Sequence, residues 1–306
     1  MAHAHPRDGA LDARRADSRR RMWVAFAING LLLAATLVGG IVTGSLALLA
    51  DGGHLLSDLG AIALGLFAAG MAGRAGGPRR TFGFQRTEVL AALGNGVALV
   101  AIGVAIVIAA IDRLTDPPEV EGAGVVALGA VGLCGNLAAT WILARGGRDD
   151  LNLEGVLRHS AADALGSAGV IVSGTVILTV GWKPIDPLAS LAIAGLILAS
   201  SWRLIAEPVN VLMEAAPVGI DPERVGRELV SLDHVRAVHE LHLWTVTPGF
   251  EALAAHVVVA RGADRDLVRR TAEVMLADTF GIEHTTLQME EEAAPQLLEV
   301  ERSAET

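Results

Sequence analysis

Six long apolar segments dominate the first two thirds of the chain. They cover residues 22–43, 46–72, 87–111, 122–144, 155–180 and 187–206, and short polar or Gly- and Pro-containing stretches separate them. A helix of about 20 apolar residues spans the hydrocarbon core of a bilayer. The pattern therefore predicts an all-α transmembrane domain of six helices over residues 22–207, preceded by a polar tail at 1–21.

The last hundred residues follow a different pattern. A short helix is predicted from Asp221, a favoured N-cap residue, with Pro222 at its first position. Two partly alternating stretches, VRAVHELHLWTVT and EALAAHVVVA, flank a Pro-Gly turn and indicate a hairpin. A helical stretch, DRDLVRRTAEVMLADTF, and an alternating one, IEHTTLQME, complete the order α-β-β-α-β. This order predicts a compact α+β domain over 208–292, followed by a loose tail at 293–306.

Composition supports a membrane protein joined to an acidic soluble domain. The 306 residues are 52% hydrophobic, with a mean hydropathy of +0.48. Residues 207–306 hold 19 of the 34 acidic side chains but only 8 of the 24 basic ones. Without a basic face to neutralise phosphates, nucleic acid is excluded as a partner. The single cysteine, Cys134, excludes an intramolecular disulfide and a thiolate metal cluster.

Basic residues predict the orientation of the chain in the membrane. Twelve arginines lie in the N-terminal tail and in the loops after the second and fourth segments, whereas the opposite side has only Arg113 and Lys183. Positive residues favour the cytoplasmic side, so both termini are predicted to be cytoplasmic. An even number of spans places both termini on the same side of the membrane, which agrees with the distribution of basic residues. We therefore expect a multi-pass protein of the inner (cell) membrane.

Two apolar segments each carry a His–Asp pair at the same spacing. They read HLLSD at 54–58 and HSAAD at 159–163. Residues four apart lie on one face of a helix, so each pair can bind one ion. Together His54, Asp58, His159 and Asp163 offer the tetrahedral N/O set that zinc favours, whereas Mg²⁺ and Ca²⁺ prefer more oxygen ligands.

The alternative is that each pair only forms a hydrogen bond within its own helix. Burying ionisable groups in hydrocarbon is costly, and a second pair at the same spacing on a separate span favours a shared ion site. Asp51 precedes the first motif. Because it lies near the end of its segment, we expect water to reach it.

The chain resembles the cation diffusion facilitator family, in its bacterial zinc-exporter branch. The resemblance runs from about residue 22 to 290 and rests on the motifs GSLALLADGGHLLSD, TFGFQRTEVLAAL, LNLEGVLRHSAADALGSAGV, DPLASL, VHELHLWTVTPG and GIEHTTLQME. It implies a homodimer in the lipid bilayer, with six membrane helices and a cytoplasmic ferredoxin-like domain. It also implies exchange of metal for protons by alternating access, with the four His and Asp residues at the transport site.

The resemblance implies a second metal site in the cytoplasmic domain. His239 and His256 match family positions that bind regulatory metal, and Asp266 or Glu290 could add an oxygen ligand. In a regular strand His239 and His242 would lie on opposite faces. The alternative is that these histidines belong to the surface or to a dimer interface.

These observations predict a secondary transporter that exports Zn²⁺, with Cd²⁺ as a possible second substrate, in exchange for protons. Zn²⁺ is then both the transported substrate and a regulatory ligand. Two alternatives use the same four ligands. A membrane-bound zinc metalloenzyme would also need a general base beside the metal, where the sequence offers only Asp51. A passive channel for divalent metals would need no coupling to protons.

Overall fold

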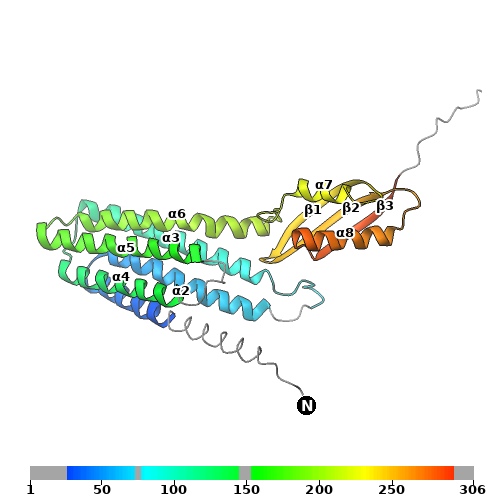
Figure 1. The fold of residues 1–306 in the computed structure, drawn as a ribbon. Helices are drawn as coiled ribbons and strands as arrows, with labels where there is room; N and C mark the ends of the chain where they lie inside the picture. Colours follow the sequence, from blue (N-terminus) through cyan, green and yellow to red (C-terminus); the bar gives the residue numbers. More distant parts are fainter. Residues whose placement is uncertain (1–25, 73–76, 145–152, 293–306) are drawn as a thin grey trace, which may run out of the picture. The chain divides into compact units, whose positions relative to one another are not determined.

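The structure is a computed structural model that describes residues 26–72, 77–144 and 153–292. Within these ranges, six helices are long and apolar enough to cross a membrane (Figure 1). They are the first helix (Phe26–Thr43), α2 (Leu46–Ala72), α3 (Thr87–Thr115), α4 (Gly122–Ala144), α5 (Leu153–Val180) and α6 (Ile185–Leu212). The six predicted spans are confirmed. The expected tails at 1–21 and 293–306 lie outside the described residues.

The C-terminal part has the predicted order α-β-β-α-β. It comprises α7 (Pro222–Val230), β1 (Val235–Thr247), β2 (Phe250–Val259), α8 (Arg265–Phe280) and β3 (His284–Glu291). The sheet order is β1-β2-β3, with β1 antiparallel and β3 parallel to the central β2. The predicted six-helix membrane part and α+β part are therefore confirmed. By its internal contacts the chain forms two compact units, and residues 77–89 belong with residues 207–292.

Local sequence signals explain the boundaries of these elements. Asp221 caps α7 by accepting a hydrogen bond from the Glu223 backbone N–H at 3.0 Å, and Pro222 occupies the first turn. Asp264 caps α8 in the same way through Leu267 N–H. Gly249 takes the positive φ of 79° required at the turn between β1 and β2. These are the positions where the sequence pattern predicts the starts of helices and the hairpin turn.

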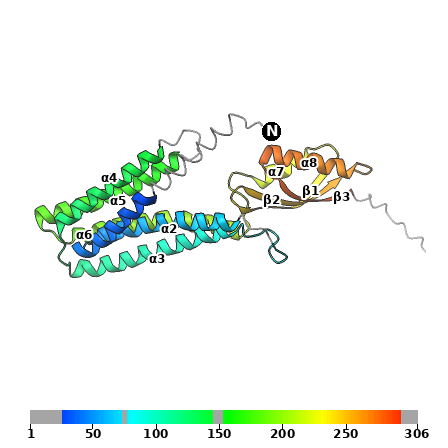
Figure 2. The same cartoon turned by 90° about the horizontal axis from the view of Figure 1, so that it is seen from below.

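The sheet has one covered face and one open face. Helices α7 and α8 lie on the same face (Figure 2) and form a core with it. This core contains Val225, Leu229, Leu243, Leu253, Ala255, Ala272, Leu276 and Ile282. Along β2, Leu253, Ala255 and Val257 are buried, whereas the residues between them, including His256, are half-buried. Strand alternation therefore places His256 on the open face.

A β-bulge interrupts β1 between its two histidines. His239 pairs with His256, and His242 pairs with Ala254, so the register shifts by one residue between them. Glu240 within this stretch has a positive φ of 49°. Because His256 and Ala254 lie on one face of β2, both histidines pair with that face. The expectation that they occupy opposite faces assumed a regular strand and fails at this bulge.

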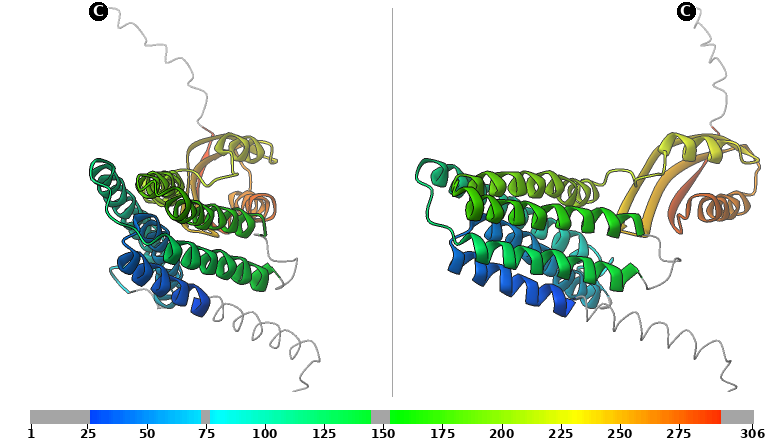
Figure 3. Two further views of the ribbon diagram at one scale, coloured as in Figure 1. Left: turned by 90° about the vertical axis from the view of Figure 1, so that its left-hand side faces the viewer. Right: turned by 60° about the vertical axis from the view of Figure 1, so that its left-hand side comes forward.

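In the membrane unit, α4 and α5 pack along each other (Figure 3). The approach is close, because a Cβ on Gly174 of α5 would lie 2.9 Å from the backbone nitrogen of Val126 on α4. Small residues allow such close packing between membrane helices. The buried core of the unit is formed by Ala47, Leu48, Ala50, Leu99, Ile106, Val125, Val170, Ile193, Ala194 and Ile197.

Asp186 connects the start of α6 to the start of α2. Its side chain is buried, with a residue exposure of 1%. One carboxylate oxygen accepts a hydrogen bond from the Ser45 hydroxyl at 2.6 Å, and the other accepts one from the Leu46 backbone N–H at 2.7 Å. A carboxylate at a helix N-terminus satisfies unpaired N–H groups and interacts favourably with the helix dipole. Asp186 therefore fixes the first turn of α2.

We predict that Asp186→Ala destabilises the membrane unit by about 3 kcal/mol, because it leaves buried donors at the start of α2 unsatisfied. Asp186→Asn should cost less, because the amide oxygen still accepts a hydrogen bond. Equilibrium unfolding of the purified protein in mixed detergent micelles measures the difference. Asp116→Ala removes an exposed acid and serves as control. Equal stability of Asp186→Ala and this control would contradict the prediction.

Candidate metal sites

Three ionisable side chains meet inside the membrane unit. The Nε2 atom of His54 lies 3.0 Å from Oδ1 of Asp163 and 3.9 Å from Oδ2 of Asp58. One ligand atom from each residue lies within 4.8 Å of the other two, and all three residues are half-buried. Two donors bound to one tetrahedral zinc at about 2.0–2.2 Å are separated by roughly 3.3 Å. The group can therefore converge on a single ion with small side-chain adjustments.

Helix geometry explains how these residues come together. His54 and Asp58 lie one turn apart on α2, and Asp163 faces them from α5. His159 lies on α5 one turn before Asp163, on the same face of the helix by its spacing. Its side chain lies outside the described part of the chain. The structure thus brings together three of the four predicted groups and places the backbone of the fourth one turn away.

Asp51 differs from the sequence expectation. It is buried, with an exposure of 3%, although its position near the segment end suggested contact with water. It lies on α2 one turn before His54, and its carboxylate faces Gly132 of α4 and Gly166 of α5. The helices that pack around it, which come from distant parts of the sequence, shield it. Its spacing of three residues from His54 is the signal that could have indicated the same helix face.

A second cluster lies on the open face of the sheet. Oε2 of Glu290 lies 3.1 Å from Nε2 of His239, and Oε1 lies 2.7 Å from Nδ1 of His256. The two imidazole ring centroids are 5.0 Å apart, and the cross-strand pairing of His239 with His256 sets this distance. One ligand atom from each of the three residues lies within 4.8 Å of the others. These two imidazoles and one carboxylate can bind a metal ion from three adjacent strands.

Neighbouring side chains orient this cluster. Gln288 donates a hydrogen bond to Oε1 of Glu290 at 3.0 Å, and Oε2 of Glu240 lies 3.5 Å from Nε2 of His256. The hydrogen bond from His239, with a smaller contribution from His256, lowers the pKa of the Glu290 carboxyl below its ordinary value. The carboxylate therefore stays ionised, as a metal ligand must be.

Asp266 does not join the cluster. It lies in the first turn of α8, where its carboxylate is exposed and 3.8 Å from Nε of Arg269. Of the two candidate carboxylates in the sequence, the structure places only Glu290 against the histidines. The parallel pairing of β3 with β2 brings it there, because Glu290 pairs with Val258 two residues beyond His256.

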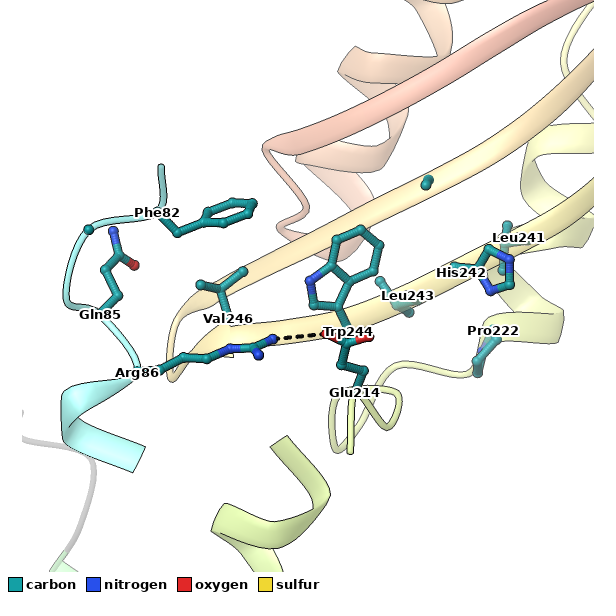
Figure 4. Close-up of a pocket in the computed structure, with 12 residues that line it drawn as sticks. Phe82, Gln85, Arg86, Glu214, Pro222, Leu241, His242, Leu243, Trp244 and Val246 are labelled. Atoms are coloured by element: carbon teal, nitrogen blue, oxygen red, sulfur yellow. Dashed lines mark hydrogen bonds and ion pairs between the residues drawn. The ribbon is translucent and has the colours of Figure 1, made fainter. Parts of the chain in front are cut away.

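The same unit contains a cavity of about 740 Å³ (Figure 4). Its wall includes Trp244 and His242 from β1 together with Phe82 from the segment before α3. Arg86 and Glu214 form an ion pair at its edge, at 3.3 Å. Among the described residues that line it, one is a histidine and one carries a carboxylate. The cavity is therefore no rival to the two clusters as a metal site.

Two family descriptions match the chain in series. The cation efflux transmembrane domain matches residues 22–213, and the cation efflux protein cytoplasmic domain matches residues 217–292. The chain belongs to the cation diffusion facilitator family. The members of this family are efflux transporters for metal cations and not enzymes, which removes the metalloenzyme alternative. As a facilitator, the chain is a multi-pass membrane protein.

Curated relatives are similar to this chain over nearly its whole length. The zinc transporter ZitB of Escherichia coli is 37% identical over 292 residues, which cover 95% of this chain and 93% of the relative. The cadmium, cobalt and zinc/H(+)-K(+) antiporter of Bacillus subtilis is 35% identical, covering 96% and 93%. The metal cation efflux system protein CzcD of Cupriavidus metallidurans is 34% identical, covering 94% and 89%.

We predict that His256→Ala lowers zinc binding by the full-length facilitator by one ion per protomer, because it removes one of three ligands on the open sheet face. Calorimetric titration of the purified protein measures this stoichiometry. Asp266→Ala should bind as much zinc as the unaltered chain, because its carboxylate lies outside the cluster. If His256→Ala retains full stoichiometry, or if Asp266→Ala loses an ion, the ligand assignment is wrong.

Proposed function

We propose that the protein exports Zn²⁺, and also Cd²⁺, from the cytoplasm in exchange for protons. The observation that carries this proposal is the meeting of His54, Asp58 and Asp163 within the membrane unit, with His159 one turn along α5. The family and the names of the relatives support metal efflux. The ligand set supports zinc, because imidazole nitrogen and carboxylate oxygen suit this ion better than harder divalent cations.

Competition for the same atoms couples zinc to protons. Zinc binds only deprotonated imidazole and carboxylate, so protonation of the site releases the metal. The carboxylates of Asp163 and Asp58 lie 3.0 and 3.9 Å from Nε2 of His54. Without a metal ion or a proton, two like charges would therefore face one imidazole ring. Protons entering from outside displace zinc there, and the lower cytoplasmic proton activity lets zinc bind again.

Alternating access completes the proposed cycle. The excess of arginine in the N-terminal tail and in the second and fourth loops supports cytoplasmic termini and an inner-membrane location. We assign residues 1–21 to a cytoplasmic tail, 22–207 to the transmembrane domain, 208–292 to the cytoplasmic domain and 293–306 to a C-terminal tail. The protein acts as a homodimer. Zinc held by His239, His256 and Glu290 tightens the dimer and regulates transport.

We expect zinc export by the reconstituted protein to carry protons in the opposite direction. Proteoliposomes that contain a trapped pH dye and a zinc-sensitive dye report both fluxes. An imposed proton gradient should accelerate zinc flux, and zinc affinity should fall as the pH drops from about 7 to 6, around the ordinary pKa of histidine. Zinc flux that is indifferent to the gradient and has no proton counterflow would indicate a passive channel instead.

Asp163→Ala is the matched variant for this experiment. It should reduce both fluxes at least about a hundredfold while the protein still folds and dimerises, because it removes a ligand that also carries a proton. Asp266→Ala, which alters an exposed carboxylate away from both clusters, should transport normally. Normal zinc flux by Asp163→Ala would rule out the proposed transport site.

Selectivity gives an independent prediction. His54→Asp replaces a nitrogen ligand with oxygen, and harder ions such as Mn²⁺ favour oxygen. We expect the ratio of zinc to manganese transport to fall roughly tenfold, which corresponds to about 1.4 kcal/mol. Competition between the two ions in the vesicle assay measures this ratio. An unchanged ratio at normal expression would show that His54 does not set selectivity.

A further inference from the structure

Asp51 is a buried acid that the proposed four-ligand site does not use. Its exposure is 3%, and it lies on α2 within the membrane unit. An acidic side chain at membrane depth is costly, and such residues usually mark the path of an ion. The surroundings of Asp51 therefore indicate what its carboxylate can bind.

Two glycines leave room around this carboxylate. A Cβ on Gly166 of α5 would lie 3.1 Å from Oδ1 of Asp51, so a side chain there would crowd the oxygen. A Cβ on Gly132 of α4 would lie 3.8 Å from Oδ2 and 3.5 Å from Oγ of Ser167. Among the described residues, no other heavy atom outside the glycine's own stretch of helix lies within 4 Å of that second position. The space above Gly132 is therefore bordered by two oxygen-bearing groups.

Ser167 provides an independent observation. Its exposure is 0%, and within the described part of the chain its Oγ has no hydrogen-bond partner. A buried hydroxyl without a partner is costly, so a ligand or water at this position would stabilise it. The same space above Gly132 that borders Asp51 also borders this hydroxyl.

We propose that Asp51 and Ser167 form a second, transient binding position for a partly hydrated divalent cation. Asp51 comes three residues before His54 on α2, and Ser167 comes four residues after Asp163 on α5. Each of these two residues therefore lies about one helical turn from a residue of the transport site. Because Asp51 lies against Gly166, both lie toward the same end of the bundle. In the proposed topology this end is the outer side. The position is a waypoint between the transport site and the outside. Its role as a waypoint rests on the proposed export of zinc.

The donor set suits brief binding. One carboxylate and one hydroxyl supply fewer than the four protein ligands of a structural zinc site, so water completes the coordination shell. The carboxylate offsets part of the charge of the ion while it crosses low-dielectric surroundings. Weak binding also allows release, as conduction through a series of sites requires.

Gly132→Ala tests this position without altering either oxygen. The added methyl group occupies the space at ordinary contact distances of 3.5 and 3.8 Å. Gly169→Ala on α5 is the matched control, because no atom of a residue that the structure describes, beyond the glycine's own helix backbone, lies within 4 Å of a Cβ there. Asp51→Asn removes the negative charge, and Ser167→Ala removes the hydroxyl group. We expect Gly132→Ala and Asp51→Asn each to lower maximal zinc flux about tenfold, Ser167→Ala about threefold and Gly169→Ala not at all.

A binding measurement separates a waypoint from an effect on the transport site. In the full-length chain with His256→Ala, which removes the cytoplasmic site, the zinc Kd should stay within about threefold of the parent in all four variants. Full flux in Gly132→Ala would overturn the proposal, as would a tenfold change of Kd in Asp51→Asn. If the unaltered protein showed no zinc flux, the proposed export itself would be refuted. This outcome is distinct from those that overturn only the waypoint.

Discussion

The cost of placing charged side chains inside an apolar helix bundle governs the membrane unit. A carboxylate or imidazolium at membrane depth is stable only with a counter-charge, a proton or a metal ion. His54, Asp58 and Asp163 bring three such groups together from α2 and α5, within 4.8 Å of one another. The proposed exchange of zinc for protons rests on this constraint, because a metal ion and protons would neutralise the same group of side chains.

The rest of the membrane unit maintains this convergence. Asp186 fixes the first turn of α2 from the start of α6, and α2 carries two of the three clustered residues. Close packing of α5 against α4 holds the helix that carries Asp163. Asp51 adds a buried carboxylate one turn before His54 on α2. In the other unit, β-sheet pairing creates a separate cluster on a surface that water can reach, where no such burial cost applies.

Local sequence patterns were sufficient to predict the elements and most of the residues that the structure brings together in the two clusters. Segment length gave the six helices, and the spacing of HLLSD placed His54 and Asp58 on one helix face. Features that depend on distant contacts could not be predicted. The burial of Asp51 depends on α4 and α5, and the role of Asp186 depends on Ser45, 141 residues away. Strand register, which a single sequence does not reveal, favours Glu290 over Asp266.

The most direct measurement of the central claim is the number of protons released when zinc binds. The full-length protein with His256→Ala, which isolates the membrane site, can be titrated with zinc between pH 6 and 7 in two buffers of different protonation enthalpy. The difference in heat gives the proton count. Exchange at the His–Asp site predicts the release of at least one proton per zinc ion. Identical heats in both buffers would mean that zinc binds without displacing protons, which would contradict proton-coupled export through this site.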